Sequence, residues 1–155
     1  MSLVIEGEER IAAPIAKVWE NLNDPDILRA SIPGCEALEK TPDGRMKATV
    51  VLKIGPIKAS FAGEVTLSNI NPPTSYTIAG EGKGGIAGFA KGGADIQLAE
   101  EGPDTTILTY KASADVGGKI AQLGSRLIVS TSKKLAGQFF STFNELSSGK
   151  ALPAQ

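Results

Sequence analysis

Histidine is absent from the sequence, and cysteine occurs once, at Cys35. The chain by itself therefore cannot form a histidine-based catalytic triad, a histidine metal site or an internal disulfide. No stretch approaches the roughly 20 apolar residues that cross a bilayer, and the first ten residues carry acids where a signal peptide carries bases. We expect a soluble, cytoplasmic protein that binds no metal.

Net charge is also almost absent. The 155 residues include 16 Lys and Arg against 17 Asp and Glu, and no block of basic residues occurs. We expect no nucleic acid partner, because polyanion binding needs a basic footprint. The length fits one domain with a sizeable core. We place this domain at residues 1–146 and a flexible C-terminal tail at 147–155.

Apolar periodicity predicts a strand followed by two short helices. The strand is expected at about residues 2–11. Pro14 suits the start of a helix whose apolar residues recur at i, i+3, i+4 and i+7, and Pro25 suits the first position of a second helix. These two helices form one bent connector.

Residues 35–116 alternate between apolar and polar side chains, with breaks at Gly, Pro, Asn and Asp clusters. This pattern predicts six more strands joined too tightly for parallel crossovers, so the sheet should be antiparallel. The expected strands are 35–40, 45–54, 57–70, 75–81, 86–99 and 105–116.

Residues 119–146 contain no proline and carry apolar residues at helical spacings, which predicts one long amphipathic helix. One face of the sheet is apolar and needs this helix as its cover. The fold class is therefore α+β. We expect a helix-grip fold, with a seven-stranded curved antiparallel sheet around a long C-terminal helix and two short helices after strand 1.

A glycine-rich segment spans residues 80–94. Gly80, Gly82 and Gly85 match the spacing G-x-G-x-x-G, but a strand follows where a dinucleotide site needs a helix. Small residues recur on the inward face of this segment and of the next strand. They indicate either a ligand cavity or merely strong sheet curvature and close helix docking, and we favour the cavity.

The predicted cavity has a mainly apolar wall. Its expected ligand-binding residues are Met46, Val50, Leu52, Phe61, Val65, Tyr76, Ile78, Ala90, Gly92, Ala94, Tyr110, Leu123, Arg126, Leu127, Thr131 and Phe139. Such a wall, with a few polar groups, suits a hydrophobic ligand that has one or two carbonyl or hydroxyl groups.

No catalytic residue is assigned. In the predicted register the acids and lysines of the strands face solvent, and Cys35 is typical of a buried, inert thiol. Catalysis is therefore disfavoured.

Residues 24–36 read D-P-x-x-L-x-x-x-I-P-G-C-E, and residues 92–98 read GGADIQL. These strings resemble the CoxG family of carbon monoxide dehydrogenase proteins, and the resemblance covers about residues 2–146. It implies a START-like, polyketide-cyclase-like fold. It also implies an accessory protein of a molybdenum hydroxylase of the carbon monoxide dehydrogenase type, associated with membrane recruitment and with the quinone acceptor.

The resemblance and the apolar wall together suggest a non-catalytic accessory protein at the inner face of the membrane. We expect no intrinsic cofactor, but a bound isoprenoid quinone or lipid whose carbonyl groups accept hydrogen bonds from Tyr76, Tyr110 or Arg126. Longer family members carry a membrane-associating C-terminal extension, whereas this chain ends nine residues after Leu146, so we expect peripheral association at most. The alternatives are a cyclase, aromatase or hydrolase on the same fold, and a ligand-free assembly factor.

Overall fold

The computed structural model describes residues 1–149, in which seven strands, three α-helices and two 3-10 turns form. In chain order these are β1 (Ser2–Ile11), α1 (Ile15–Leu22), α2 (Pro25–Ser31), β2 (Cys35–Lys40), β3 (Met46–Ile54), β4 (Ile57–Asn71), β5 (Ser75–Lys83), η1 (Gly85–Ala87), β6 (Phe89–Gly102), β7 (Thr105–Gly117), η2 (Lys119–Leu123) and α3 (Ser125–Ser147). Of the predicted tail at 147–155, residues 150–155 lie outside the described part.

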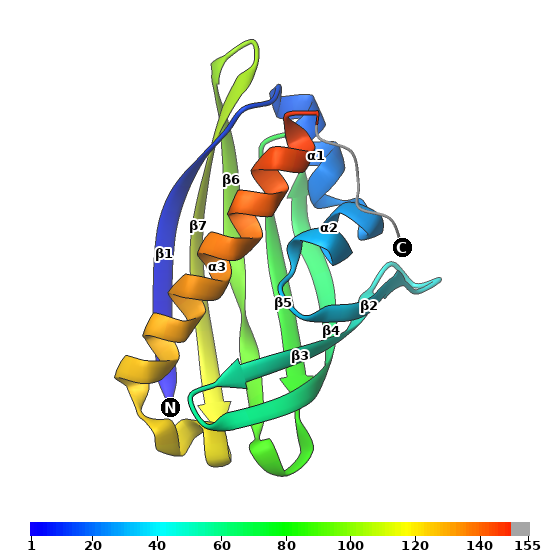
Figure 1. The fold of residues 1–155 in the computed structure, drawn as a ribbon. Coiled ribbons are helices and arrows are strands. Elements are labelled where there is room, and N and C mark those ends of the chain that lie inside the picture. Colours follow the sequence, from blue (N-terminus) through cyan, green and yellow to red (C-terminus); the bar gives the residue numbers. More distant parts are fainter. Residues whose placement is uncertain (150–155) are drawn as a thin grey trace.

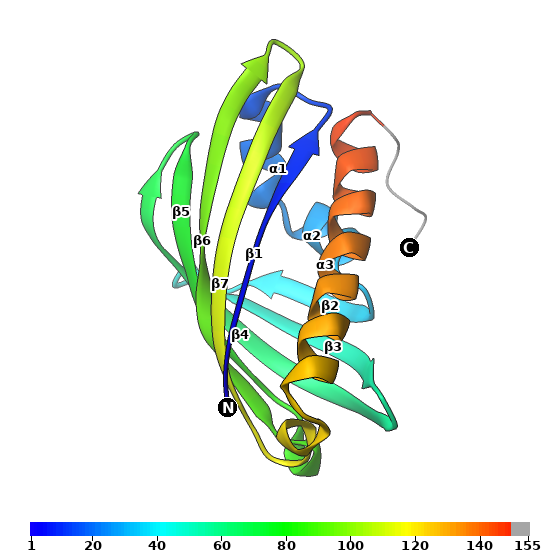
Figure 2. The ribbon, with the colours of Figure 1, turned by 90° about the vertical axis from the view of Figure 1, so that its left-hand side faces the viewer.

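All seven strands form one antiparallel sheet in the order β1-β7-β6-β5-β4-β3-β2. Consecutive strands from β2 to β7 are neighbours, and β1 closes the order by pairing with β7. The sheet curves around α3, which lies across its concave face (Figures 1 and 2). The α+β helix-grip fold predicted from the sequence is therefore confirmed.

Local sequence signals explain the two helices of the connector. Pro14 has extended backbone and precedes α1, and Asp24 caps α2 because its side chain accepts a hydrogen bond from the backbone N–H of Asp26 at 2.9 Å. Pro25 occupies the first turn of α2, where no backbone donor is needed. The connector ends at Ile32, whose backbone is extended.

The long C-terminal helix predicted from residue 119 is interrupted. Residues 119–123 form the 3-10 turn η2, and α3 begins only at Ser125. The reason is backbone conformation, because Gly118 and Gly124 have φ of +82° and +90°, where a helix cannot continue. Likewise β6 begins at Phe89 instead of residue 86, because η1 occupies the preceding residues.

The C-terminal half of α3 is tied to the start of the chain. Asn144 Oδ1 accepts a hydrogen bond from the backbone N–H of Ala12 at 2.8 Å. Asn21 Nδ2 donates to Ser147 Oγ at 3.0 Å, and both residues are buried. Phe143 between them is fully buried. These contacts fix the helix against α1 and β1, and they place Ser147 in the folded domain. No helix within residues 1–149 combines the length and the hydropathy needed to cross a membrane.

Two separate hydrophobic clusters hold α3 to the sheet. The larger cluster includes Val18, Leu108 and Phe143 at the end near α1. The smaller one, at the end near η1 and η2, consists of Leu3, Ala87, Val116, Ile120 and Ile128. The space between the clusters is not filled by side chains, and it forms the candidate site.

Candidate functional site

A cavity of about 620 Å³ lies between the concave face of the sheet and α3. This volume falls within the range of about 300–1,000 Å³ that is typical of small-molecule sites. Close-packed interiors contain few voids larger than a water molecule, so a space of this size is a feature of the fold and not a packing defect.

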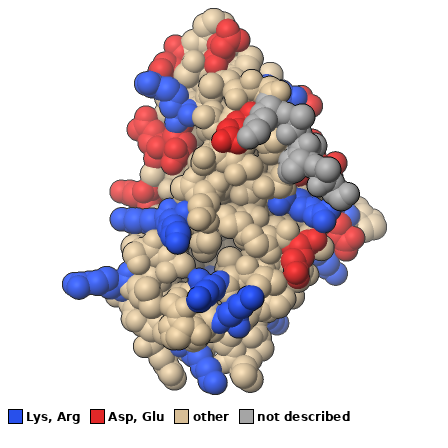
Figure 3. All heavy atoms as spheres, viewed as in Figure 1, with Lys and Arg blue, Asp and Glu red and all other residues tan. Residues whose placement is uncertain are grey.

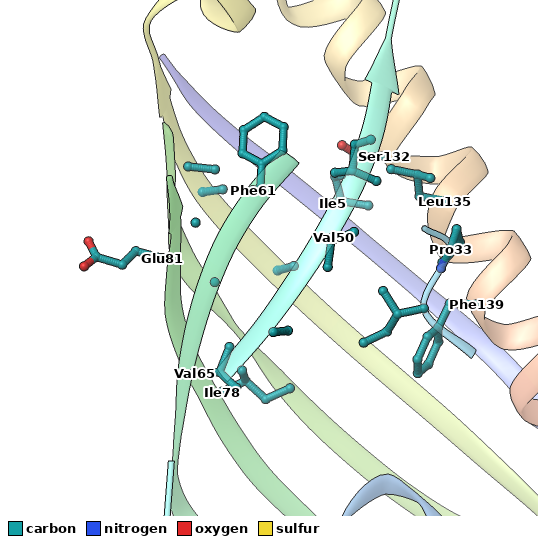
Figure 4. A pocket seen from close by; sticks show the side chains of 18 of the residues that line it. Ile5, Pro33, Val50, Phe61, Val65, Ile78, Glu81, Ser132, Leu135 and Phe139 are labelled. Atoms are coloured by element: carbon teal, nitrogen blue, oxygen red, sulfur yellow. The ribbon is translucent and has the colours of Figure 1, made fainter. Parts of the chain in front are cut away.

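Nearly all of the wall is aliphatic or aromatic. It is contributed by every strand, by α1, α2 and α3, and by the α2–β2 turn. Its residues are Leu3, Ile5, Leu22, Leu28, Ile32, Pro33, Leu38, Met46, Ala48, Val50, Leu52, Ile54, Phe61, Gly63, Val65, Leu67, Tyr76, Ile78, Glu81, Gly82, Ala90, Ile96, Leu108, Ala112, Ala114, Val116, Ile120, Ile128, Thr131, Ser132, Leu135, Phe139 and Phe140. Figure 4 shows Leu135 and Phe139 of α3 on one side of this space and Val50 and Phe61 on the other.

Ten of the sixteen residues predicted to bind a ligand line this cavity. They are Met46, Val50, Leu52, Phe61, Val65, Tyr76, Ile78, Ala90, Thr131 and Phe139. Sheet register brings the strand residues together, since Val50 lies opposite Phe61 and Met46 lies opposite Val65 on neighbouring strands. Their role in binding a ligand remains a prediction.

Three predicted residues of the sheet lie elsewhere, each for a packing reason. Gly92 adjoins the backbone of β7 so closely that a Cβ would be 2.0 Å from the carbonyl oxygen of Ser113. Ala94 packs against the larger hydrophobic cluster. Tyr110 stacks on Phe140 with ring centroids 5.4 Å apart and covers Gly7 of β1.

Three predicted residues near the start of α3 also lie outside the wall. A Cβ at Gly55 in the β3–β4 turn would meet Leu127 at 2.9 Å and Leu123 at 4.0 Å, so both leucines pack toward this turn. Arg126 is exposed. The break at Gly124 changes the helical phase on which these three assignments depended.

The wall contains four residues with polar side chains. Ser132 Oγ donates to the backbone carbonyl of Ile128 at 2.8 Å, so its hydroxyl is already partnered. Glu81 is exposed and points away from the cavity (Figure 4). Tyr76 and Thr131 therefore supply the hydroxyl groups that a ligand can use within the described wall.

Tyr76 is the more deeply buried of the two, with 5% of its surface exposed. Burial raises the pKa of the Tyr76 phenol far above its ordinary value, so the group stays protonated and can donate a hydrogen bond. Within residues 1–149 its hydroxyl forms no hydrogen bond, although no fully enclosed polar side-chain atom there lacks a partner. The hydroxyl is therefore not sealed by protein atoms.

Cys35 is half-buried and not fully buried as predicted. Its Sγ donates to the backbone carbonyl of Ala37 at 3.3 Å, and burial raises the pKa of the thiol. A raised pKa keeps the thiol protonated near neutral pH, so Cys35 is a poor nucleophile.

Sequence reasoning missed the wall residues contributed by β1 and by the connector. The alternation of β1 placed Leu3 and Ile5 on one face and could have identified them. Leu28 and Pro33 lie in the wall because α2 docks beside α3, and no local periodicity encodes that contact.

Comparisons with known proteins agree with this geometry. The family model of the carbon monoxide dehydrogenase protein CoxG matches residues 7–147. No curated protein sequence matches the chain directly. Among solved structures, a conserved protein from Geobacillus kaustophilus is 32% identical with a TM-score of 0.88, over 94% of this chain and 95% of that chain.

More distant structures share the fold. The Zhui aromatase/cyclase from Streptomyces sp. R1128 is 12% identical with a TM-score of 0.69, over 95% of this chain and 94% of that one. A START superfamily protein from Mycobacterium smegmatis is 16% identical with a TM-score of 0.63, over 94% of both chains. With its START-like fold and a family match over nearly its whole length, the chain belongs to the CoxG family of carbon monoxide dehydrogenase proteins.

Proposed function

We propose that this protein is a non-catalytic accessory protein that carries an isoprenoid quinone or a similar hydrophobic molecule. Its partner would be a molybdenum hydroxylase of the carbon monoxide dehydrogenase type, which the protein helps couple to the membrane quinone pool. The observation that carries the proposal is the apolar cavity of about 620 Å³, together with membership of the family.

The chemistry of the wall suits a quinone. Aliphatic and aromatic side chains favour an isoprenoid chain, because burial of apolar surface drives binding without directional contacts. A quinone ring presents carbonyl oxygens that need donors when they leave water. The hydroxyl groups of Tyr76 and Thr131 can supply these donors.

An enzyme on the same fold is less well supported. The fold is shared with an aromatase/cyclase, but fold alone does not imply chemistry. General acid–base catalysis needs a titratable group within reach of the substrate. In the described wall the single carboxylate, that of Glu81, points away from the cavity (Figure 4).

Organic extraction of the natively purified protein, followed by mass spectrometry, tests the proposal first. Native mass spectrometry of the same sample counts the bound molecules. Titration of ligand-free protein with a short-chain ubiquinone analogue, followed by Trp19 fluorescence, then measures affinity. We expect a stoichiometric quinone or lipid, or saturable uptake of the added quinone. A protein that is empty and takes up no quinone, yet still co-purifies with the dehydrogenase, would replace the carrier by a ligand-free assembly factor.

A further inference from the structure

Basic residues collect at the end of the molecule formed by the β3–β4, β5–β6 and β7–α3 connections. Residues 53–58, 82–94 and 117–126 contain no Asp or Glu. They carry the exposed residues Lys53, Lys58, Lys83, Lys91, Lys119 and Arg126. At the lower end of Figure 3 this face shows Lys and Arg but no Asp or Glu, although the whole chain has a net charge of −1.

Most of these cations are not neutralised by neighbours. Lys83 lies 4.0 Å from Glu81, and Lys91 lies between Glu81 and Asp115 on the adjacent strands. The remaining four, which are Lys53, Lys58, Lys119 and Arg126, form no ion pair within residues 1–149. Their charge is therefore available to an anionic partner.

Apolar side chains protrude at the same end. Ile86 in η1 is 84% exposed, and Phe89 at the start of β6 is 48% exposed. Met1, which is 44% exposed, adjoins them at the start of β1. Three of the five large hydrophobic residues that are exposed within residues 1–149 thus lie at this end, and the other two are Val4 and Ile70.

The turn that presents Ile86 is a defined structure. The backbone N–H of Gly84 donates to the carbonyl of Gly88 at 2.8 Å, and the N–H of Ala87 donates to the carbonyl of Gly84 at 3.1 Å. Gly88 packs against the backbone of Gly117, where a Cβ would come within 2.1 Å of the carbonyl oxygen. Because the tip is pre-organised, little conformational entropy is lost when Ile86 is buried by a partner.

We propose that this basic end, with Ile86 and Phe89 at its tip, docks on the surface of an anionic lipid bilayer. The apolar tip enters the boundary between headgroups and acyl chains, and the surrounding lysines face anionic headgroups. A protein partner fits less well. Protein interfaces are depleted in Lys and bury roughly 800 Å² per partner, whereas here five of the six cations are Lys around a small tip.

Docking in this orientation brings the cavity close to the membrane. Ala87 of η1 is buried against Val116 and Ile120, which also line the cavity. One layer of side chains therefore separates the docking surface from the candidate ligand site. The docking proposal does not depend on the identity of the ligand.

Co-sedimentation with quinone-free vesicles tests the proposal. We expect binding to vesicles that contain phosphatidylglycerol in phosphatidylcholine, and little binding to phosphatidylcholine alone. Raising the salt from about 0.1 M to about 1 M shortens the Debye length from about 10 to about 3 Å and should release most of the protein. The double variant Lys119→Gln, Arg126→Gln should bind on the order of tenfold more weakly, at about 1 kcal/mol per cation.

Ile86→Ser should weaken binding at least fivefold, and Ile70→Ser is the matched control. Ile70 is 54% exposed and precedes the β4–β5 turn at the opposite end of the sheet, so its substitution should leave binding unchanged. Thermal unfolding of both variants checks that they fold. Equal binding of Ile86→Ser and wild type, equal binding to neutral vesicles, or no binding at all would overturn the proposal. Because the vesicles carry no quinone, such a failure leaves the quinone titration to judge the carrier function separately.

Discussion

The ring of Trp19 meets the ring of Tyr76 edge to face, with centroids 5.4 Å apart and planes at 89°. Tyr76 lines the cavity, whereas Trp19 belongs to α1 and is the chain's single tryptophan. The pair therefore couples the cavity wall to one intrinsic fluorophore. A ligand that contacts Tyr76 should change the emission of Trp19, which gives the binding measurements a direct optical signal.

The Tyr76 hydroxyl is the first group to test. We expect Tyr76→Phe to weaken quinone binding by about two- to tenfold, the cost of about 0.5–1.5 kcal/mol for one hydrogen bond. The free energy of unfolding of the ligand-free protein should stay the same or rise slightly, since the hydroxyl forms no hydrogen bond within residues 1–149. Quinone titration and urea unfolding measure the two effects. Tyr110→Phe is the control, because Tyr110 lies outside the wall, and an equal loss of affinity in both variants would contradict the assignment.

Alkaline pH should destabilise the protein through the same residue. Burial raises the pKa of Tyr76 in the folded state, whereas tyrosine in the unfolded chain titrates near its ordinary value of about 10. Above that pH the unfolded chain loses a proton that the folded chain keeps, so the free energy of unfolding falls as the pH rises. Tyr76→Phe should reduce this slope between about pH 9 and pH 11 in urea unfolding. An unchanged slope would show that Tyr76 does not contribute to it.

Filling the cavity should block uptake of a ligand. Ala90 lines the cavity, so Ala90→Phe places a ring in the space that a ligand would occupy. We expect loss of quinone binding with little loss of stability, because the added ring enters an existing space and not a packed core. The matched control is Ala99→Phe on the exposed face of the same strand. Full binding by Ala90→Phe would mean that the ligand lies elsewhere.

Two glycines should respond to alanine in opposite directions. Gly88 has a φ of +122°, and a Cβ there would lie 2.1 Å from the carbonyl oxygen of Gly117, so Gly88→Ala should cost at least about 2 kcal/mol of stability. Gly137 lies within α3, and no atom lies within 4 Å of the position that a Cβ would occupy, so Gly137→Ala should add about 0.5–1 kcal/mol. Urea unfolding measures both changes. Similar values for the two variants would refute the close approach at Gly88.

The strands and their inward faces could be predicted from the sequence because alternation is a local property. Met46 and Val50 of β3, and Phe61 and Val65 of β4, follow the period of two, and the structure brings all four to the cavity. The string of residues 24–36 likewise indicated the family that the family model matches.

The start of α3 could not be predicted in the same way. Leu123 and Leu127 follow the helical period, yet the positive φ of Gly124 separates them into different elements. Glycine permits such a break without requiring it. Only the packing of both leucines toward the β3–β4 turn determines which way they point.

Side-chain periodicity and one contiguous string were enough to predict the class of the fold, the apolar face of the sheet and the family. The extent of the cavity and the gathering of the cations depend instead on how the elements pack in three dimensions. Lys53, Lys83 and Lys119 are far apart in a chain of nearly zero net charge, and they meet at one end because three separate connections meet there. Composition sums charge over the chain, whereas folding determines where each charge lies.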